Sequence, residues 1–214
     1  MIKKTEKFQT DQEKFWAGVF GNKYSIRNEG SGLLASNLKL FSTALNLAGQ
    51  ISTCIEFGAN IGMNFRALSL LYPKMKFKGV EINKTAVKML SKLIGFRNVF
   101  QGSIFDYSST AKADLVLVKG VLIHINPAKL NLVYEKIHLA ARKYILICEY
   151  YNPSPVSVTY RGNTDRLFKR DFAGEILNKY QDIKLVDYGF VYRHDNAFPL
   201  DDVTWFLLKR DEQK

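Results

Sequence analysis

The sequence predicts an α/β fold: a doubly wound, mostly parallel seven-stranded sheet with helices on both faces and an antiparallel hairpin at one edge. Between residues 51 and 150, short apolar runs alternate with segments of helical periodicity. These runs are apolar rather than alternating, and the run 114–119 is nearly all apolar, as expected for strands that are covered on both faces. Two further strand patterns near the C-terminus are separated mainly by turn residues, which predicts that they pair as a hairpin.

The elements follow in order along the chain. Two helices are expected at residues 10–20 and 33–48, on either side of the polar stretch 21–32. Strands are expected at 51–57, 76–82, 98–102, 114–119 and 143–149, and the helices between them at 61–71, 83–94 and 127–141. Asn83 suits a helix N-cap and Pro127 a first helical turn. A loop then leads to a helix at 171–180, and the hairpin strands lie at 183–192 and 203–209.

No repeat or low-complexity linker divides the 214 residues, so we expect one domain spanning 1–214. Within it, residues 1–50 form an N-terminal helical segment and candidate lid. Residues 51–150 form a cofactor-binding core, and residues 151–214 carry an acceptor-binding loop and the edge hairpin.

The composition excludes several protein classes. Hydrophobic residues make up 47% and charged residues 24%, which excludes a disordered chain. No apolar run approaches the roughly 20 residues of a membrane span, and the first residues lack the apolar segment of a secretory signal, so we expect a cytoplasmic protein. Cys54 and Cys148 each lie within an apolar run and are expected to be buried free thiols. No metal-site spacing is present, and the oligomeric state is not encoded in any pattern.

The net charge is +11, which favours anionic partners such as nucleic acid, phosphorylated or carboxylated small molecules, or the inner membrane surface. The cations form no polybasic block and are interleaved with acids through most of the chain. Charge alone therefore does not decide between a specific anionic partner and an incidental excess.

A turn rich in small residues follows the first core strand, in the run Glu56-Phe-Gly58-Ala-Asn60-Ile-Gly62. Glycines there allow close backbone approach to a ligand at a helix N-terminus. Glu81 ends the next strand about twenty residues later, where a carboxylate can accept hydrogen bonds from ribose hydroxyls. The dinucleotide pattern G-x-G-x-x-G is not met, because Asn60 and Met63 stand at two of its glycine positions. No phosphate-loop Lys-Ser/Thr pair follows either.

These residues resemble the pattern of class I S-adenosylmethionine-dependent methyltransferases, whose fold is Rossmann-like. Asn60 replaces the middle glycine, and asparagine tolerates a positive φ better than other non-glycine residues. The resemblance implies S-adenosyl-L-methionine as cofactor, with adenine held after the third strand and the methyl-transfer cleft lined by the run 114–124. The residues it assigns to the cofactor are Glu56, Gly58, Asn60, Gly62, Glu81, Ile82, Ser103, Ile104, Phe105 and Lys119.

The chain is also similar to a narrower group, the methylases associated with pseudaminic acid biosynthesis. That likeness rests on residues 12–28, on Lys119–Pro127, and on Glu149–Pro153 through Asp171 and Phe172. It implies O-methylation of an anionic sugar, a nonulosonic or pseudaminic acid-type molecule or its nucleotide-linked form, in surface glycan biosynthesis. N- or C-methylation of such a sugar stays open.

His124 follows the fourth core strand at the carboxyl edge of the sheet, where open α/β folds bind ligands. It is the candidate general base for a hydroxyl acceptor. A substrate contact without proton transfer and a purely structural role are the alternatives. His138, within a predicted helix, is expected to pack, and His194 to be exposed at a turn.

Two further segments carry candidate binding residues. Trp16 and Tyr24 either dock a helix onto the sheet or, with Arg27, close over the bound sulfonium, Arg27 meeting the carboxylate of the donor. The segment 149–170 follows the fifth strand and offers hydrogen-bonding aromatics and cations for a carboxylated or phosphorylated sugar, although some of these cations could simply be solvated. Its candidate acceptor-binding residues are Tyr150, Tyr151, Asn152, Tyr160, Arg161, Arg166, Lys169 and Arg170.

Two other functions compete with this hypothesis. A nucleic-acid methyltransferase is favoured by the charge but lacks the Asn/Asp-Pro-Pro-aromatic motif after the fourth strand, where Lys119 and Gly120 stand. It also lacks a Pro-Cys nucleophile. Both absences disfavour a nucleic-acid partner, while methylation of a ribose or a ring nitrogen stays open. The second alternative is a non-catalytic domain that binds S-adenosylmethionine without turnover.

Overall fold

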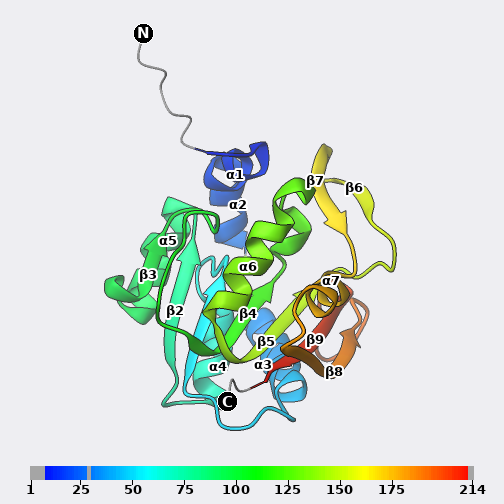
Figure 1. Cartoon of the computed structure of the whole chain (residues 1–214). Helices are drawn as coiled ribbons and strands as arrows, with labels where there is room; N and C mark the ends of the chain where they lie inside the picture. The colour runs from blue at the N-terminus through cyan, green and yellow to red at the C-terminus, as the bar shows by residue number, and fades with distance from the viewer. Residues whose placement is uncertain (1–7, 28–29, 212–214) are drawn as a thin grey trace.

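The computed structural model describes residues 8–27 and 30–211, and a seven-stranded sheet lies at its centre (Figure 1). The strand order is β3-β2-β1-β4-β5-β9-β8. The first five strands are parallel, whereas β9 is antiparallel to both β5 and β8. Their bounds are β1 Thr53–Phe57, β2 Lys76–Glu81, β3 Val99–Gln101, β4 Ala113–Lys119, β5 Ala141–Glu149, β8 Ile183–Val191 and β9 Val203–Arg210. The predicted doubly wound sheet with an antiparallel edge hairpin is confirmed.

Helices cover both faces of this sheet. The helices α3 (Ser31–Ala44), α4 (Met63–Leu71) and α5 (Lys84–Ile94) pack into the core on one face. The helices α6 (Leu130–Ala140) and α7 (Phe172–Lys179) pack into the core on the other. In β4, Leu115 and Leu117 contribute to the first core and Val116 and Val118 to the second, as expected for a strand buried on both sides. Both cysteines are buried and free, as predicted.

The N-terminal segment contains two short helices, α1 (Asp11–Ala17) and α2 (Val19–Arg27), in place of the single predicted helix. Gly18, whose backbone is extended, separates them. Part of the stretch 21–32 is therefore helical rather than irregular. A Cβ atom at Gly21 would lie 1.8 Å from the backbone oxygen of Trp16, so glycine is required where the two helices meet.

The segment after β5 also differs from the prediction. The expected loop contains a second, two-stranded sheet of β6 (Val156–Tyr160) and β7 (Asn163–Lys169). Arg161 and Gly162 connect the strands with φ angles of 48° and 78°. Two consecutive positive φ angles match the twist of a tight hairpin, and glycine adopts one of them without strain. The signal for this hairpin was Gly162 in a two-residue turn after the strand-favouring run Val156–Tyr160.

Three 3₁₀ turns complete the chain: η1 (Phe96–Asn98), η2 (Leu122–His124) and η3 (Pro127–Lys129). The predicted helix at 127–141 thus begins as η3 and continues as α6. In the part of the chain that the structure describes, no helix is both long enough and apolar enough to cross a membrane.

Candidate functional site

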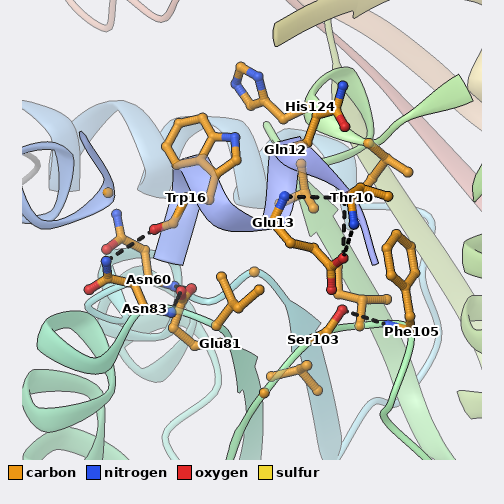
Figure 2. A pocket seen from close by; sticks show the side chains of 18 of the residues that line it. Thr10, Gln12, Glu13, Trp16, Asn60, Glu81, Asn83, Ser103, Phe105 and His124 are labelled. Atoms are coloured by element: carbon orange, nitrogen blue, oxygen red, sulfur yellow. Dashed lines mark hydrogen bonds between the residues drawn. The ribbon is translucent and has the colours of Figure 1, made fainter. Parts of the chain in front are cut away.

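A cavity with about 810 Å³ of empty space, part of it open to solvent, lies at the carboxyl ends of β1, β2 and β4. The loops after these strands form one side, and helices α1 and α2 form the other. Figure 2 shows Glu81, Asn60 and Asn83 toward one end of this cavity, Ser103 and Phe105 toward the other, and Trp16 and His124 beside them.

The turn after β1 forms the floor of the cavity. Gly58, Asn60 and Gly62 all have positive φ angles, of 73°, 46° and 85°. Asn60 therefore adopts the left-handed conformation expected of a glycine replacement. The amides of Gly58 and Ala59 donate to the carbonyl of Val80, which joins the turn to the end of β2. Gly58 and Asn60 line the cavity, whereas Gly62 lies behind them at the start of α4.

Glu81 is the buried acid of the cavity. Its carboxylate accepts hydrogen bonds from the amides of Asn60 at 2.8 Å and Asn83 at 2.7 Å. Burial raises its pKa, and these backbone amides oppose that shift. Each carboxylate oxygen retains a second acceptor position, so Glu81 can receive hydroxyl donors from a ligand while it holds the turn.

Apolar and small residues line the opposite end of the cavity. Ile82, Ser103, Ile104 and Phe105, four of the residues assigned to the cofactor by resemblance, all line it. The Ser103 hydroxyl accepts a hydrogen bond from the amide of Phe105 at 3.1 Å and keeps its own proton for another acceptor. This end therefore combines a flat apolar surface with one polar hydroxyl.

The α1–α2 side of the cavity was only partly anticipated. Trp16 and Tyr24 line it as expected, but Thr10 and Glu13 do so as well. Thr10 is the N-cap of α1, and Glu13 completes its capping box, a pattern that the sequence does show. Gly120 and Val121 also line the cavity, and they belong to the run 114–124 that was expected to line the methyl-transfer cleft. The other lining residues that sequence reasoning missed are Gln12, Gly21, Ser25, Val80, Asn83, Gly102, Ile125 and Asn126.

Asn83 fastens these helices to the core. Its side-chain oxygen caps α5, as predicted, by accepting from the amides of Thr85 and Ala86. Its amide nitrogen donates to the backbone oxygen of Trp16 at 3.1 Å and to the side chain of Asn22 at 2.9 Å. The Asn83 side chain thus joins α5 to both α1 and α2.

Three other predicted cofactor residues do not line the cavity: Arg27, Glu56 and Lys119. Arg27 lies at the end of α2, exposed, with its guanidinium over the Phe20 ring. Glu56 is buried beneath the turn, where Asn64 donates to one carboxylate oxygen and the other has no partner among the described residues. Burial raises the pKa of Glu56 to about 8, while the nearby Lys119 ammonium partly opposes the shift.

Glu149, at the end of β5, holds the loop that follows β4. Its carboxylate accepts from the amides of Val121 and Leu122 at 2.8 and 2.9 Å, and from that of Ile123 at 3.5 Å. Burial raises the pKa of Glu149 to about 7, although these amides favour the charged form. The three amides lead directly into His124.

His124 faces the cavity from the end of η2. Its ring lies 4.5 Å from that of Trp16 and 5.1 Å from that of Tyr160, measured between centroids. Burial lowers the pKa of His124 to about 4, although the carbonyl oxygen of Arg166 beside Nδ1 favours the protonated ring. The imidazole is therefore neutral near pH 7.

The predicted acceptor-binding residues lie outside the cavity lining, on and around the β6–β7 hairpin. The Tyr160 ring lies beside that of His124, tilted by 56°, and the Arg166 side chain lies over the Phe15 ring with its Nε buried and without a partner among the described residues. Arg170 is engaged in an ion pair with Glu175. The remaining candidates lie farther along this segment: Tyr150 beneath Lys169, Tyr151 near Phe206, Asn152 bonded to Ser154, and Arg161 at the hairpin turn.

The hairpin also contacts the N-terminal helices. The side chain of Gln12 donates to the backbone oxygen of Asp165 at 2.9 Å, and the Phe20 ring lies 5.9 Å from that of Tyr160. Helices α1 and α2 and the hairpin therefore form a continuous cover beside His124.

The other histidines lie elsewhere. His138 stacks on Tyr180 and contacts Asp182, whereas His194 is exposed. Among the residues that the structure describes, no group of three or more His, Cys, Asp or Glu side chains is arranged to hold a metal ion.

No protein-family model and no curated protein match the sequence. Solved structures do match the fold. One is the 1,6-didemethyltoxoflavin-N1-methyltransferase of Burkholderia thailandensis, with bound 1,6-didemethyltoxoflavin and S-adenosylhomocysteine. It is 12% identical, with a TM-score of 0.69 over 94% of this chain and 87% of that one. The chain has a methyltransferase fold.

Two further solved structures match the fold of this chain over nearly their whole length. The plantazolicin methyltransferase in complex with S-adenosylhomocysteine is 13% identical, with a TM-score of 0.64 and 94% of each chain covered. The magnesium protoporphyrin IX methyltransferase of Synechocystis, with bound S-adenosylmethionine, is 12% identical, with a TM-score of 0.64 over 94% of this chain and 98% of that one. At these identities the likeness establishes the fold, and the activity rests on the residues of the site.

Proposed function

We propose that the protein is an S-adenosylmethionine-dependent methyltransferase whose donor binds in the cavity between the core sheet and helices α1 and α2. The observation that carries this proposal is the pairing of Glu81 with the left-handed turn at Asn60. The carboxylate and the turn are joined by a hydrogen bond and face one cavity at the carboxyl edge of the sheet. Methyltransferases with the same fold hold S-adenosylmethionine or its product in their structures.

The chemistry of the cavity fits this donor. Glu81 has acceptor positions for ribose hydroxyls, and Ile82 and Phe105 offer apolar surface for a flat base near the Ser103 hydroxyl. Two buried polar atoms at the cavity have no partner among the described residues: Nε1 of Trp16 and Oδ1 of Asn60. A polar ligand would satisfy both, and buried polar groups in proteins are normally satisfied.

When bound, S-adenosylmethionine supplies an electrophilic methyl group on a sulfonium, and transfer needs an acceptor atom aligned with it. The proposed roles of this chain are to orient the donor and the acceptor and to exclude water. The rings of Trp16 and Tyr24 cover the cavity from α1 and α2, where aromatic faces favour a positive charge. His124, neutral and held by its Nδ1 atom, presents Nε2 as the proton acceptor for a hydroxyl.

For the acceptor we propose an anionic sugar of the nonulosonic or pseudaminic acid type, free or nucleotide-linked. The sequence resemblance supports this class, as does the position of Arg166 beside His124. The Arg166 side chain is partly exposed, so the outer part of its guanidinium could pair with a ligand carboxylate. Tyr160, next to His124 on the hairpin, could stack against a sugar ring.

Methyl transfer is tested by incubating the purified protein with labelled S-adenosylmethionine and a panel of free and CMP-linked nonulosonic acids. Labelled sugar supports the full proposal. Label transferred to another small molecule retains the methyltransferase but rejects the sugar, and label transferred to RNA alone rejects the small-molecule acceptor.

Donor binding is tested separately by calorimetry with S-adenosylmethionine and S-adenosylhomocysteine. We expect Glu81→Gln to weaken both by about 10- to 100-fold, since charge-assisted hydrogen bonds to hydroxyls contribute roughly 1.5–3 kcal/mol. The exposed Glu135→Gln is the matched control. The absence of binding to the unaltered protein would overturn the proposal at its base.

A further inference from the structure

The exposed charge of this protein is unevenly distributed. Between residues 30 and 105, all of which the structure describes, the only acids are Glu56 and Glu81, and both are buried. This part of the chain therefore exposes cations with no carboxylate among them. Six exposed cations belong to α4, α5 and the turns that follow these helices: Arg66, Lys74, Lys84, Lys88, Lys92 and Arg97.

The two helices present these side chains on one side of the molecule. Phe65 and Leu68 of α4 and Leu90 of α5 enter the same core, so the outer sides of both helices face solvent on the same side of the sheet. Leu93 of α5 also lies against the start of α4 at Gly62. Within α5, Lys84, Lys88 and Lys92 are four residues apart and form one stripe along the helix. We call this surface the α4–α5 face.

None of the six cations forms an ion pair with a described residue. Some cations elsewhere on the chain do form ion pairs, as Arg142 does with Asp114 and Lys184 with Asp211. No ion pair within the described structure thus neutralises these six cations, although Lys84 shares a surface pocket with Asp106, and their charge is available to an anionic partner.

Large apolar side chains lie among these cations. Phe96 is 81% exposed, Leu70 62% and Leu93 40%. Phe96 directly precedes Arg97, and Leu93 directly follows Lys92. Lysines together with exposed Leu and Phe are the composition of surfaces that rest on anionic lipid, where the apolar groups enter the headgroup region and the cations meet phosphates. Nucleic acid would use the cations but offers no apolar layer for Leu70 and Leu93.

We propose that the α4–α5 face docks this protein on an anionic lipid bilayer, with the α5 axis along the membrane surface. The attachment is peripheral and reversible, because it relies on a few cations and three apolar side chains and on no spanning helix among the described residues. The proposal does not depend on the reaction, since docking is measured without donor or acceptor.

The test is sedimentation of the full chain with vesicles of phosphatidylcholine alone or mixed with phosphatidylglycerol. We expect binding only to the mixed vesicles, weakening as salt is raised. Each lysine near an anionic surface contributes roughly a five-fold factor, so Lys88→Gln with Lys92→Gln should lower partitioning about 25-fold. Phe96→Ala should lower it about ten-fold without changing the salt dependence.

The matched control is Lys112→Gln with Lys209→Gln, which removes the same charge at exposed positions outside the α4–α5 face. We expect partitioning within about two-fold of the unaltered protein, allowing for the change in net charge. An equal loss in the control and test pairs would overturn the proposal, because it would show non-specific attraction. No binding to anionic vesicles, or RNA binding that depends on Lys88 and Lys92 in its place, would overturn it too.

Discussion

The Nδ1 atom of His124 lies 2.5 Å from the backbone carbonyl oxygen of Arg166 on strand β7. A carbonyl oxygen can only accept a hydrogen bond, so Nδ1 carries the proton and the neutral ring keeps Nε2 as its acceptor. The β6–β7 hairpin, which was predicted to be a loop, thus determines which ring nitrogen of His124 carries the proton.

The burial of His124 predicts the pH dependence of turnover. Burial lowers the pKa of His124 to about 4, so Nε2 is unprotonated above that pH. We expect kcat/KM, which reports the free enzyme, to fall as the pH drops through about 4 rather than near the ordinary histidine value of 6.5. His124→Ala should lower kcat by about 10²- to 10⁴-fold and leave the dissociation constant of the donor within a few-fold.

The exposed His194→Ala is the control and should retain full turnover. Quenched assays with labelled donor at a series of pH values measure turnover, and calorimetry measures the dissociation constant of the donor. If turnover of His124→Ala matches that of the control while donor binding is intact, His124 is not the proton acceptor.

Glu149 acts on His124 through the backbone. Its carboxylate accepts three consecutive amides, from residues 121 to 123, which fixes the turn that ends in His124. Glu149→Gln keeps one acceptor oxygen but turns an NH₂ group toward an amide donor. We therefore expect kcat to fall about ten-fold with KM for the donor nearly unchanged, because the base is displaced by a fraction of an ångström.

Glu135→Gln, on the exposed side of α6, is the matched substitution for this experiment. A fall in donor affinity equal to the fall in kcat would show that Glu149 maintains the whole cavity rather than the position of His124. Unchanged kcat would remove Glu149 from the proposed mechanism.

Glu56 predicts an unusual dependence of stability on pH. Its folded pKa is about 8 and its ordinary value is 4.5, so between these values the folded state holds a proton that the unfolded state has released. The free energy of unfolding should therefore fall as the pH rises from about 4.5 to 8 and should level off above 8. The slope from this group is at most about 1.4 kcal/mol per pH unit.

Denaturant unfolding at a series of pH values measures this slope, and Glu56→Gln should flatten it. Glu149, whose folded pKa is about 7, and Glu81, whose pKa burial also raises, contribute to the remaining slope in the same direction. His124 opposes it between about pH 4 and 6.5, because its folded pKa is lowered. A slope that is identical in the unaltered protein and in Glu56→Gln would mean that Glu56 is ionised in the folded state.

The sequence could predict those parts of the molecule whose signals are local. Asn60 and Glu81 are 21 residues apart, within one strand-helix-strand unit, and their bond follows from that unit. Asn83 could be identified as an N-cap because the cap bonds span only two and three residues. The apolar β4 run likewise shows its burial directly.

Other parts depend on contacts between distant segments. Gln12 meets Asp165 across 153 residues, and no periodicity in α1 encodes that pairing. The same holds for Asn83 and Trp16, 67 residues apart, so the second role of Asn83 was not visible. The fold of the core was therefore predictable, whereas the cover over the cavity depends on how α1, α2 and the hairpin pack together.

That cover can be tested at a single backbone position. Gly21 lies at the junction of α1 and α2 and lines the cavity, and a Cβ there would lie 1.8 Å from the Trp16 backbone oxygen. Since this atom is backbone, Gly21→Ala must separate the two helices. We expect donor affinity to fall at least ten-fold, because Trp16 and Tyr24 move away from the site.

Gly32→Ala is the matched control, because nothing lies within 4 Å of a Cβ at Gly32 and the residue is within helix α3. Alanine there should leave donor binding unchanged and raise stability by up to about 1 kcal/mol, the ordinary gain in a helix. Calorimetry with the donor and thermal unfolding of the two variants distinguish a change in the cover over the cavity from a loss of the folded core. Gly21→Ala should lose donor affinity and retain most of its unfolding enthalpy. Retained affinity would show that the donor site does not need α1 and α2 in the observed positions, and the proposed cover would then be a structural attachment only.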